Sequence, residues 1–242
     1  MKKVLLGTAV AAMLAGTAHA ESGAYVGLGF GKAFANSKNK ISGTGNDGLG
    51  DSVPAGFGER KLKDKSAITG KFFGGYEFDL SNIVFLTEFG FALDDAEAKY
   101  DKDLTITEAE DDDGNAPKIT STTLKRNRTF SLGLGVRKQL VNNFSVLGGV
   151  DLLHSQFEVK NKASGNFAAG VNNVNKKKSK FGVGPWIGAA WDLGMVQAGL
   201  RYQYSRYQTL KTSGNFVSGD IAVSNKVKPE FHTVMVTVSK KF

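Results

Sequence analysis

Residues 67–78 read AITGKFFGGYEF and residues 83–93 read IVFLTEFGFAL. In both stretches most apolar side chains stand at alternate positions, and polar or small residues occupy the positions between them. A period of two is that of a β-strand, whose successive side chains point to opposite faces. The connector DLSN, residues 79–82, is short and polar. The two stretches therefore predict a β-hairpin.

The same alternation recurs in six further stretches, at residues 23–34, 124–138, 144–160, 179–193, 195–207 and 230–242. In each, one face is apolar and the other carries Gly, Ser, Thr and charged residues. The three short connections are 79–82, 139–143 and 192–194. They alternate with four long ones, at about 35–66, 95–123, 161–178 and 208–229. Short turns that alternate with long loops are typical of a membrane-spanning up-and-down barrel with both termini on the side of the turns.

Composition narrows the alternatives. A hydrophobic content of 41% is too low for a bundle of membrane helices, and the absence of cysteine excludes disulfides, thiolate metal sites and cysteine nucleophiles. The net charge of +8 comes from 31 basic and 23 acidic residues spread along the chain, which favours solvated loops over a nucleic-acid partner. A soluble β-sandwich would also alternate, but it would not be expected to keep one face apolar on eight strands. We therefore expect an eight-stranded antiparallel transmembrane β-barrel.

The first twenty residues have the pattern of a secretory signal peptide. A basic start at Lys2 and Lys3 precedes an apolar run. Ala18 and Ala20 are the two small residues of a small-x-small motif, which is typical of a signal-peptidase site. The apolar run is shorter than the roughly 20 residues that span a bilayer. We expect cleavage after Ala20, which leaves residues 21–242 as the barrel.

The opening stretch GAYVGLGFG (23–31), the closing stretch VMVTVSKKF (234–242) and the signal peptide carry a family resemblance. The chain resembles small eight-stranded outer-membrane barrels, of the OmpA-type transmembrane domain and the opacity-protein group. The resemblance implies a monomer in the bacterial outer membrane with both termini periplasmic. Its implied partners are outer-membrane lipid, lipopolysaccharide, the barrel-assembly machinery and host surface molecules. Phe242 would be the assembly signal, although Lys240 stands where an apolar or aromatic residue is usual.

The same resemblance implies a structural role in envelope integrity and an adhesin-like surface role. Eight strands enclose a space that side chains just fill, so a wide porin is not expected. A narrow channel of low conductance for small ions or solutes is the alternative. A barrel enzyme that modifies lipids is a third possibility.

Four charged residues fall on the inward-facing positions at a similar distance from the short turns: Lys71, Glu88, Asp151 and Arg201. Charges inside a lipid-clad barrel are costly unless they pair, so a mutual cluster in the lumen is expected. Counting back from the turns places Lys71 opposite Gly90, and Arg201 near Trp186 and Gly188. Such a cluster would plug the lumen or gate small ions.

Five basic residues share the apolar parity of their strands but lie beyond the apolar stretch, towards the long loops. They are Lys32, Arg126, Arg128, Lys160 and Arg206. On the lipid-facing side, charges are tolerated near the interface, where they can meet anionic head groups. We expect these residues to contact lipopolysaccharide phosphates. Ordinary snorkelling of long side chains to the interface is the alternative.

Catalytic, cofactor and metal sites are not expected. His154 and Ser155 are adjacent, so on a strand they point to opposite faces and cannot form a catalytic pair. The acidic stretch 108–113 lacks an EF-hand pattern, because Ala109 and Thr120 stand where acidic ligands are needed. Looser binding of a divalent cation there stays open.

Overall fold

The computed structural model describes residues 23–46, 52–55, 59–80, 83–100, 104–105, 118–164, 174–217 and 221–242. All regular secondary structure in these residues is β-strand. Within the same ranges, no helix has the length and apolar character needed to cross a membrane. The predicted signal peptide, with its cleavage site at Ala18 and Ala20, lies outside the described residues.

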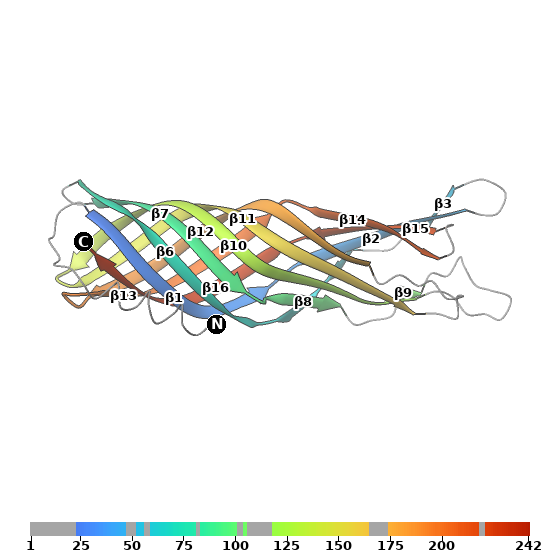
Figure 1. Ribbon diagram of the computed structural model, residues 1–242, viewed down its shortest axis with the longest axis horizontal. Helices are drawn as coiled ribbons and strands as arrows, with labels where there is room; N and C mark the ends of the chain where they lie inside the picture. The colour runs from blue at the N-terminus through green and yellow to red at the C-terminus, as the bar shows by residue number, and fades with distance from the viewer. Residues whose placement is uncertain are drawn as a thin grey trace.

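Eight long strands form a closed barrel. They are β1 (Gly23–Ala35), β6 (Ala67–Leu80), β7 (Ile83–Asp94), β10 (Lys118–Val141), β11 (Phe144–Ser164), β12 (Val174–Asp192), β13 (Gln197–Tyr207) and β16 (Glu230–Lys241). Each pairs antiparallel with the next of these strands in the chain, and β16 pairs with β1 to close the wall. Figure 1 shows the strands wound obliquely around the long axis. The predicted eight-stranded antiparallel barrel is confirmed.

The register of the closed sheet sets the width of the lumen. Starting at Gly23, the paired residues around the wall are Glu77, Leu86, Gly135, Gly149, Trp186, Gln203, Thr233 and finally Ala33. One circuit around the wall therefore starts at residue 23 of β1 and returns to β1 at residue 33. Such a stagger in an eight-stranded barrel requires tilted strands and leaves an interior that side chains can fill.

The two faces of the wall differ as the alternation predicts. Large apolar side chains point outward and are exposed, among them Leu134 (69%) and Ile187 (64%). Inward positions hold buried Ser, Thr and charged residues. A soluble sandwich would bury its apolar faces between two sheets, whereas here the apolar face covers the outside of one closed sheet.

We call the end where β6 meets β7, β10 meets β11 and β12 meets β13 the turn end, and the opposite end the loop end. β1 begins and β16 ends at the turn end (Figure 1). The connections at the turn end are short, and those at the loop end are long.

The described parts of the long connections contain strands, although we expected loops there. These strands are β2 (Lys38–Asn46), β3 (Ser52–Ala55), β4 (Glu59–Lys61), β5 (Lys63–Lys65), β8 (Glu97–Tyr100), β9 (Leu104–Thr105), β14 (Leu210–Val217) and β15 (Ile221–Lys228). A second sheet runs β14-β15-β2-β3, with β4 also paired to β2, while β8 and β9 pair with β10. With the loop-end parts of β10, β11 and β12, these strands form the β-extension. Where the structure describes their side chains, buried and exposed residues alternate in these strands as they do in the barrel strands.

Candidate functional site: the charged lumen

Four charged side chains from four strands meet inside the barrel. Lys71 Nζ lies 2.6 Å from Glu88 Oε1 and 3.7 Å from Asp151 Oδ2. Arg201 Nη1 lies 2.7 Å from Glu88 Oε1, and its Nη2 lies 2.8 Å from Asp151 Oδ2. The structure thus brings together all four residues expected in the lumen, each cation in contact with both carboxylates. We call them the lumen ion cluster.

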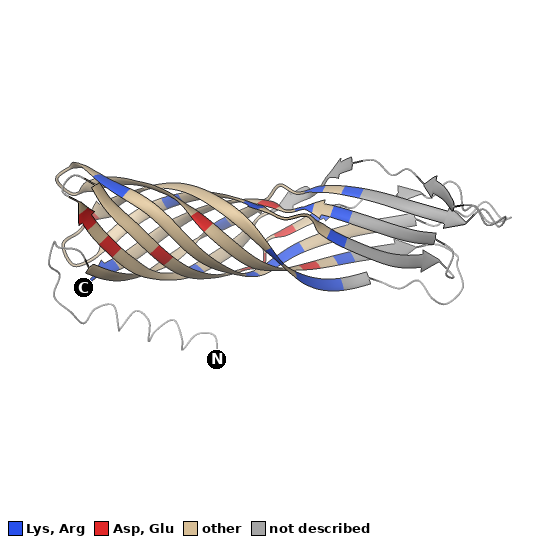
Figure 2. Cartoon of the chain, turned by 90° about the horizontal axis from the view of Figure 1, so that it is seen from above, with Lys and Arg blue, Asp and Glu red and all other residues tan. Residues whose placement is uncertain are grey.

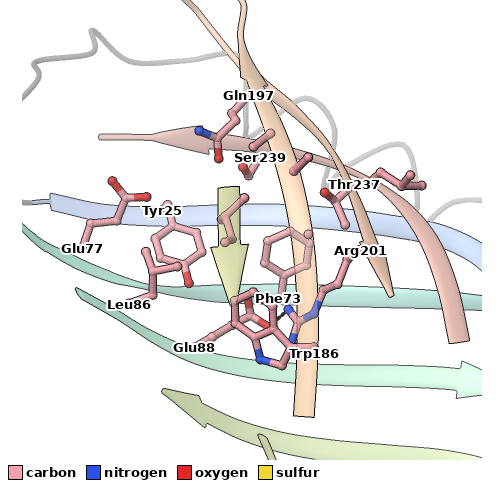
Figure 3. Close-up of a pocket in the computed structure, with 15 residues that line it drawn as sticks. Tyr25, Phe73, Glu77, Leu86, Glu88, Trp186, Gln197, Arg201, Thr237 and Ser239 are labelled. Carbon is pink, nitrogen blue, oxygen red and sulfur yellow. Dashed lines mark hydrogen bonds and ion pairs between the residues drawn. The ribbon is translucent and has the colours of Figure 1, made fainter. Parts of the chain in front are cut away.

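Polar and aromatic neighbours hold the lumen ion cluster in place. Trp186 Nε1 donates a hydrogen bond of 2.8 Å to Asp151 Oδ1, and Gln203 Nε2 donates one of 2.8 Å to Asp151 Oδ2. The Arg201 guanidinium lies over the Trp186 ring, 3.9 Å from its centroid. Figure 3 shows Trp186, Glu88 and Arg201 converging. Asp151 is fully buried (0% exposed), and its charge is balanced within the lumen ion cluster.

The hairpin register differs from the count made on the sequence. Leu80 pairs with Ile83, so Lys71 stands opposite Ala92 rather than Gly90. Strand pairing between β6 and β7 extends to Leu80 and Ile83, so the connection is shorter than the expected connector at 79–82. A shift of two residues keeps every side chain on its face, so Lys71 still reaches Glu88. Its side chain passes over Gly90, where a Cβ atom would collide with Lys71 Cε. Arg201 pairs with Gly188, as expected.

A second group of charges lies nearer the turn end. Arg137 Nη1 and Nη2 donate to the two carboxylate oxygens of Glu77, at 2.7 and 2.8 Å. Lys241 Nζ lies 3.2 Å from Glu77 Oε2. A small cavity between this group and the lumen ion cluster is lined by Tyr25 and Thr237, among others (Figure 3). Sequence reasoning missed the Glu77 group, although all three charges occupy inward-facing positions.

A third ion pair corrects one prediction. Arg126 is buried (4% exposed) and does not face lipid. Its Nε lies 3.0 Å from both carboxylate oxygens of Asp94, and its Nη2 lies 2.7 Å from Asp94 Oδ2. The register of β10 against β11 shifts between Arg126 and Arg128, so one extra residue turns Arg126 into the lumen. The expectation that Arg126 contacts lipopolysaccharide was wrong for this reason.

An apolar plug fills the lumen towards the loop end. Its largest fully buried members are Leu62, Leu124, Phe157, Val159, Leu210, Val227 and Phe231. The Phe157 and Phe231 rings stack with centroids 6.1 Å apart, and the Arg126 guanidinium lies 4.3 Å from the centroid of the Phe231 ring. Sequence reasoning did not find this plug. The sequence feature that could have indicated the plug is the presence of apolar residues, such as Phe157 and Val159, at inward-facing positions.

The other four rim candidates are exposed: Lys32, Arg128, Lys160 and Arg206. The Arg206 side chain is 64% exposed and its Nε lies 3.8 Å from Glu230 Oε1. Lys160 Nζ lies 3.2 Å from Glu158 Oε1. Both therefore have a carboxylate neighbour within the chain, and their contact with lipid stays a proposal.

The chain end lies against the first barrel strand. The Phe242 backbone N–H donates to Ala24 O at 2.8 Å, and the Phe242 ring is partly exposed at the turn end. Lys240 is buried, with Nζ 5.8 Å from the centroid of the Phe242 ring. The Phe242 ring is therefore packed beside an ammonium group.

The histidine and serine considered for catalysis lie on opposite faces. His154 faces outward against Phe181, with ring centroids 4.8 Å apart. Ser155 is buried in the lumen, with Oγ 2.6 Å from Thr129 Oγ1 and 2.9 Å from the Tyr207 hydroxyl. Among the described residues, no group of three or more His, Asp or Glu side chains could hold a metal ion. The acidic stretch 108–113 lies outside those residues.

A family model for the outer membrane protein β-barrel domain matches residues 4–242. The chain belongs to this outer-membrane β-barrel family. It is an integral protein of the bacterial outer membrane, so the turn end is the periplasmic end and the β-extension is extracellular. No curated protein matches the chain at a significant level of similarity.

Several solved structures are similar to the chain. Ail of Yersinia pestis, in complex with the heparin analogue sucrose octasulfate, is 13% identical, with a TM-score of 0.39, over 91% of this chain and 99% of Ail. Neisserial surface protein A is also 13% identical, with a TM-score of 0.41, over 91% of this chain and 99% of that protein. The Escherichia coli outer membrane protease OmpT is 7% identical, with a TM-score of 0.44, over 90% and 97%.

Proposed function

We propose that this family member is a closed structural barrel that supports the integrity of the outer membrane and presents its β-extension as a binding surface. The observation that carries the proposal is the filling of the lumen. The lumen ion cluster crosses the membrane-embedded part of the lumen, and the apolar plug closes the lumen towards the loop end. With its interior occupied, the molecule offers other molecules its outer surface.

The filled lumen also weighs against transport. Each charge of the lumen ion cluster is paired. A water-filled path for ions or solutes would require these ion pairs to break, which would leave unpaired charges inside the barrel. Beyond them, Phe157 and Phe231 are fully buried. A narrow channel is the second candidate. The small cavity between Glu77 and the lumen ion cluster favours it, because that part of the lumen is incompletely filled.

A deletion strain tests the envelope role. We expect it to take up an apolar dye several-fold faster than the parent and to be more sensitive to detergent, and we expect the wild-type chain supplied in trans to reverse both effects. The channel role makes the opposite prediction, because loss of a channel slows the entry of small hydrophilic solutes. An intact dye barrier together with slower solute entry would therefore reject the envelope role.

The exposed rim cations are proposed to hold lipopolysaccharide phosphates. A triple substitution of Lys32, Arg128 and Arg206 by Gln should reduce the lipopolysaccharide that co-purifies with the barrel. Each cation near an anionic surface contributes about 1 kcal/mol, so the three together should reduce retention at least tenfold. Phosphate content per barrel measures the effect, and Lys138→Gln, at the periplasmic end, is the control. Unchanged retention would leave snorkelling as the explanation.

A further inference from the structure

The second sheet of the β-extension carries five lysines on its outer face. They are Lys38 and Lys40 on β2, Lys226 and Lys228 on β15, and Lys211 on β14, and all five are exposed. We call them the lysine lattice. Figure 2 shows basic residues gathered on the strands of the β-extension.

The strand register sets the lysines against one another. Lys38 pairs with Lys228, Lys40 pairs with Lys226, and Lys211 also pairs with Lys226. Like charges directly opposite each other destabilise a sheet. Along each strand, lysines two residues apart share a face at a spacing of about 7 Å. The sheet thus holds a compact array of positive charge at a cost in stability.

Protection of a sheet edge accounts for Lys211, on the edge strand β14, but not for the four lysines on β2 and β15. Natural sheets place lysine on edge strands to prevent aggregation. β15, however, is paired with β14 on one side and β2 on the other, while β2 is paired with β15 on one side and with β3 and β4 on the other. Solubility would be served as well by mixed charges, which avoid the repulsion.

The fold prevents these lysines from turning inward. Asn39, Val227 and Leu210, their neighbours in the chain, are buried on the opposite face. The acidic residues nearest in register are Glu59, which pairs with Lys40, and Glu230, two residues beyond Lys228. The four lysines of β2 and β15 outnumber these two acids, which lie on β4 and β16, so the outer face has an excess of positive charge.

The lysine lattice continues the membrane rim along one side of the molecule. β2 follows β1, which carries Lys32 on the same face, and β15 leads into β16, the partner of β13 with its exposed Arg206. The extended segment from Lys32 on β1 to Lys38 at the start of β2 spans about 15 Å along the barrel axis. The lattice therefore faces sideways, just above the lipid surface. That layer of the outer leaflet is occupied by the core sugars of lipopolysaccharide, which carry phosphates.

We propose that the lysine lattice binds the phosphorylated inner core of a lipopolysaccharide molecule that stands beside β2 and β15. The proposal rests on the proposed function in one respect, that the outer surface is the working part of the barrel. Lysine ammonium groups are mobile point charges, which suits phosphates spread over several sugars better than a single fixed phosphate. Lys32 and Arg206 lie at the rim, where the same molecule's lipid A phosphates would be.

The test replaces Lys38, Lys40, Lys226 and Lys228 by Gln in the full chain, held in detergent micelles. Affinity for purified lipopolysaccharide with a phosphorylated core is measured at low and at physiological salt. We expect the loss of each pair of lysines to weaken the affinity about tenfold. The variant with four substitutions should therefore bind about a hundredfold more weakly than wild type, and its affinity should depend less on salt. The control replaces Lys138, Lys176 and Lys177, three exposed lysines outside the lattice, and should bind within about threefold of wild type.

Two further ligands identify the chemistry that the lattice recognises. Lipopolysaccharide with a dephosphorylated core should bind the wild type as weakly as the intact ligand binds the lattice variant. A heparin fragment, a soluble sulfated polysaccharide, should bind the wild type more weakly than intact lipopolysaccharide does. Wild-type affinity in the lattice variant, or a loss confined to heparin, would overturn the proposal.

The folding of the lattice variant is checked by the heat-dependent shift of the barrel band in gel electrophoresis. Its dye barrier in cells is measured separately. A lattice variant that loses lipopolysaccharide while the dye barrier remains would support this proposal. If the deletion strain kept an intact dye barrier while the lysine lattice still bound lipopolysaccharide, the result would count against the envelope role alone.

Discussion

Replacing Glu88 by Ala is expected to lower the free energy of unfolding by about 3–5 kcal/mol. Glu88 Oε1 contacts both Lys71 Nζ and Arg201 Nη1. Its loss leaves two buried cations with Asp151 as their remaining partner in the lumen ion cluster. The midpoint of the heat-dependent band shift, together with denaturant unfolding in lipid vesicles, measures the change.

The control for Glu88→Ala is Asp95→Ala. The Asp95 side chain is 77% exposed and lies 3.1 Å from Lys125 Nζ. An exposed pair of this kind contributes about 0–1 kcal/mol. Lys71→Met added to Glu88→Gln should recover part of the loss, because it removes the surplus cation and leaves the Arg201–Asp151 pair. Equal stability of the Glu88 and Asp95 variants would contradict the assignment of a buried, mutually dependent cluster.

Replacing Phe157 by Ala is expected to cost a further, independent 3–5 kcal/mol, about the value for a large core aromatic. Phe157 is fully buried against Phe231 and against Tyr207, whose ring centroid lies 4.9 Å away. The substitution removes a ring from the centre of the apolar plug and leaves a cavity there. Denaturant unfolding measures the loss of stability.

Phe89→Ala is the matched control for the plug. Phe89 is 54% exposed on the outer face of β7 and packs against lipid. Because lipid fills the space left by the ring, the cost should be about 1–2 kcal/mol. If Phe157→Ala cost no more than Phe89→Ala, the apolar plug would not be a packed core.

The barrel strands were predictable because their alternation is strong. All eight predicted stretches overlap the observed strands. The ends differ by up to three residues at the turn end and, in β10, β11 and β12, by four to six residues at the loop end. The β-extension was missed because its sequence is rich in lysine, glycine and serine, as in KNKISGTGN of β2. In such a stretch the outward face is no longer apolar, so the contrast between the two faces disappears once the strand leaves the membrane.

The lumen ion cluster was partly predictable. Inward parity identifies Lys71, Glu88, Asp151 and Arg201, but only barrel closure brings Arg201 on β13 across to Glu88 on β7. That contact depends on the stagger of the whole sheet, which no single hairpin encodes. Arg126 was misplaced because the bulge before Arg128 reverses parity within the strand. The bulge leaves no sign in the pattern of apolar residues.

The closed lumen is tested most directly by the current through single molecules of the wild-type protein in a planar lipid bilayer. With the lumen ion cluster paired and the apolar plug in place, we predict no steady current. The double variant Glu88→Ala with Phe157→Ala, which breaches both, should conduct. A steady current through the wild-type protein that the double substitution leaves unchanged would contradict the closed lumen and favour the narrow channel.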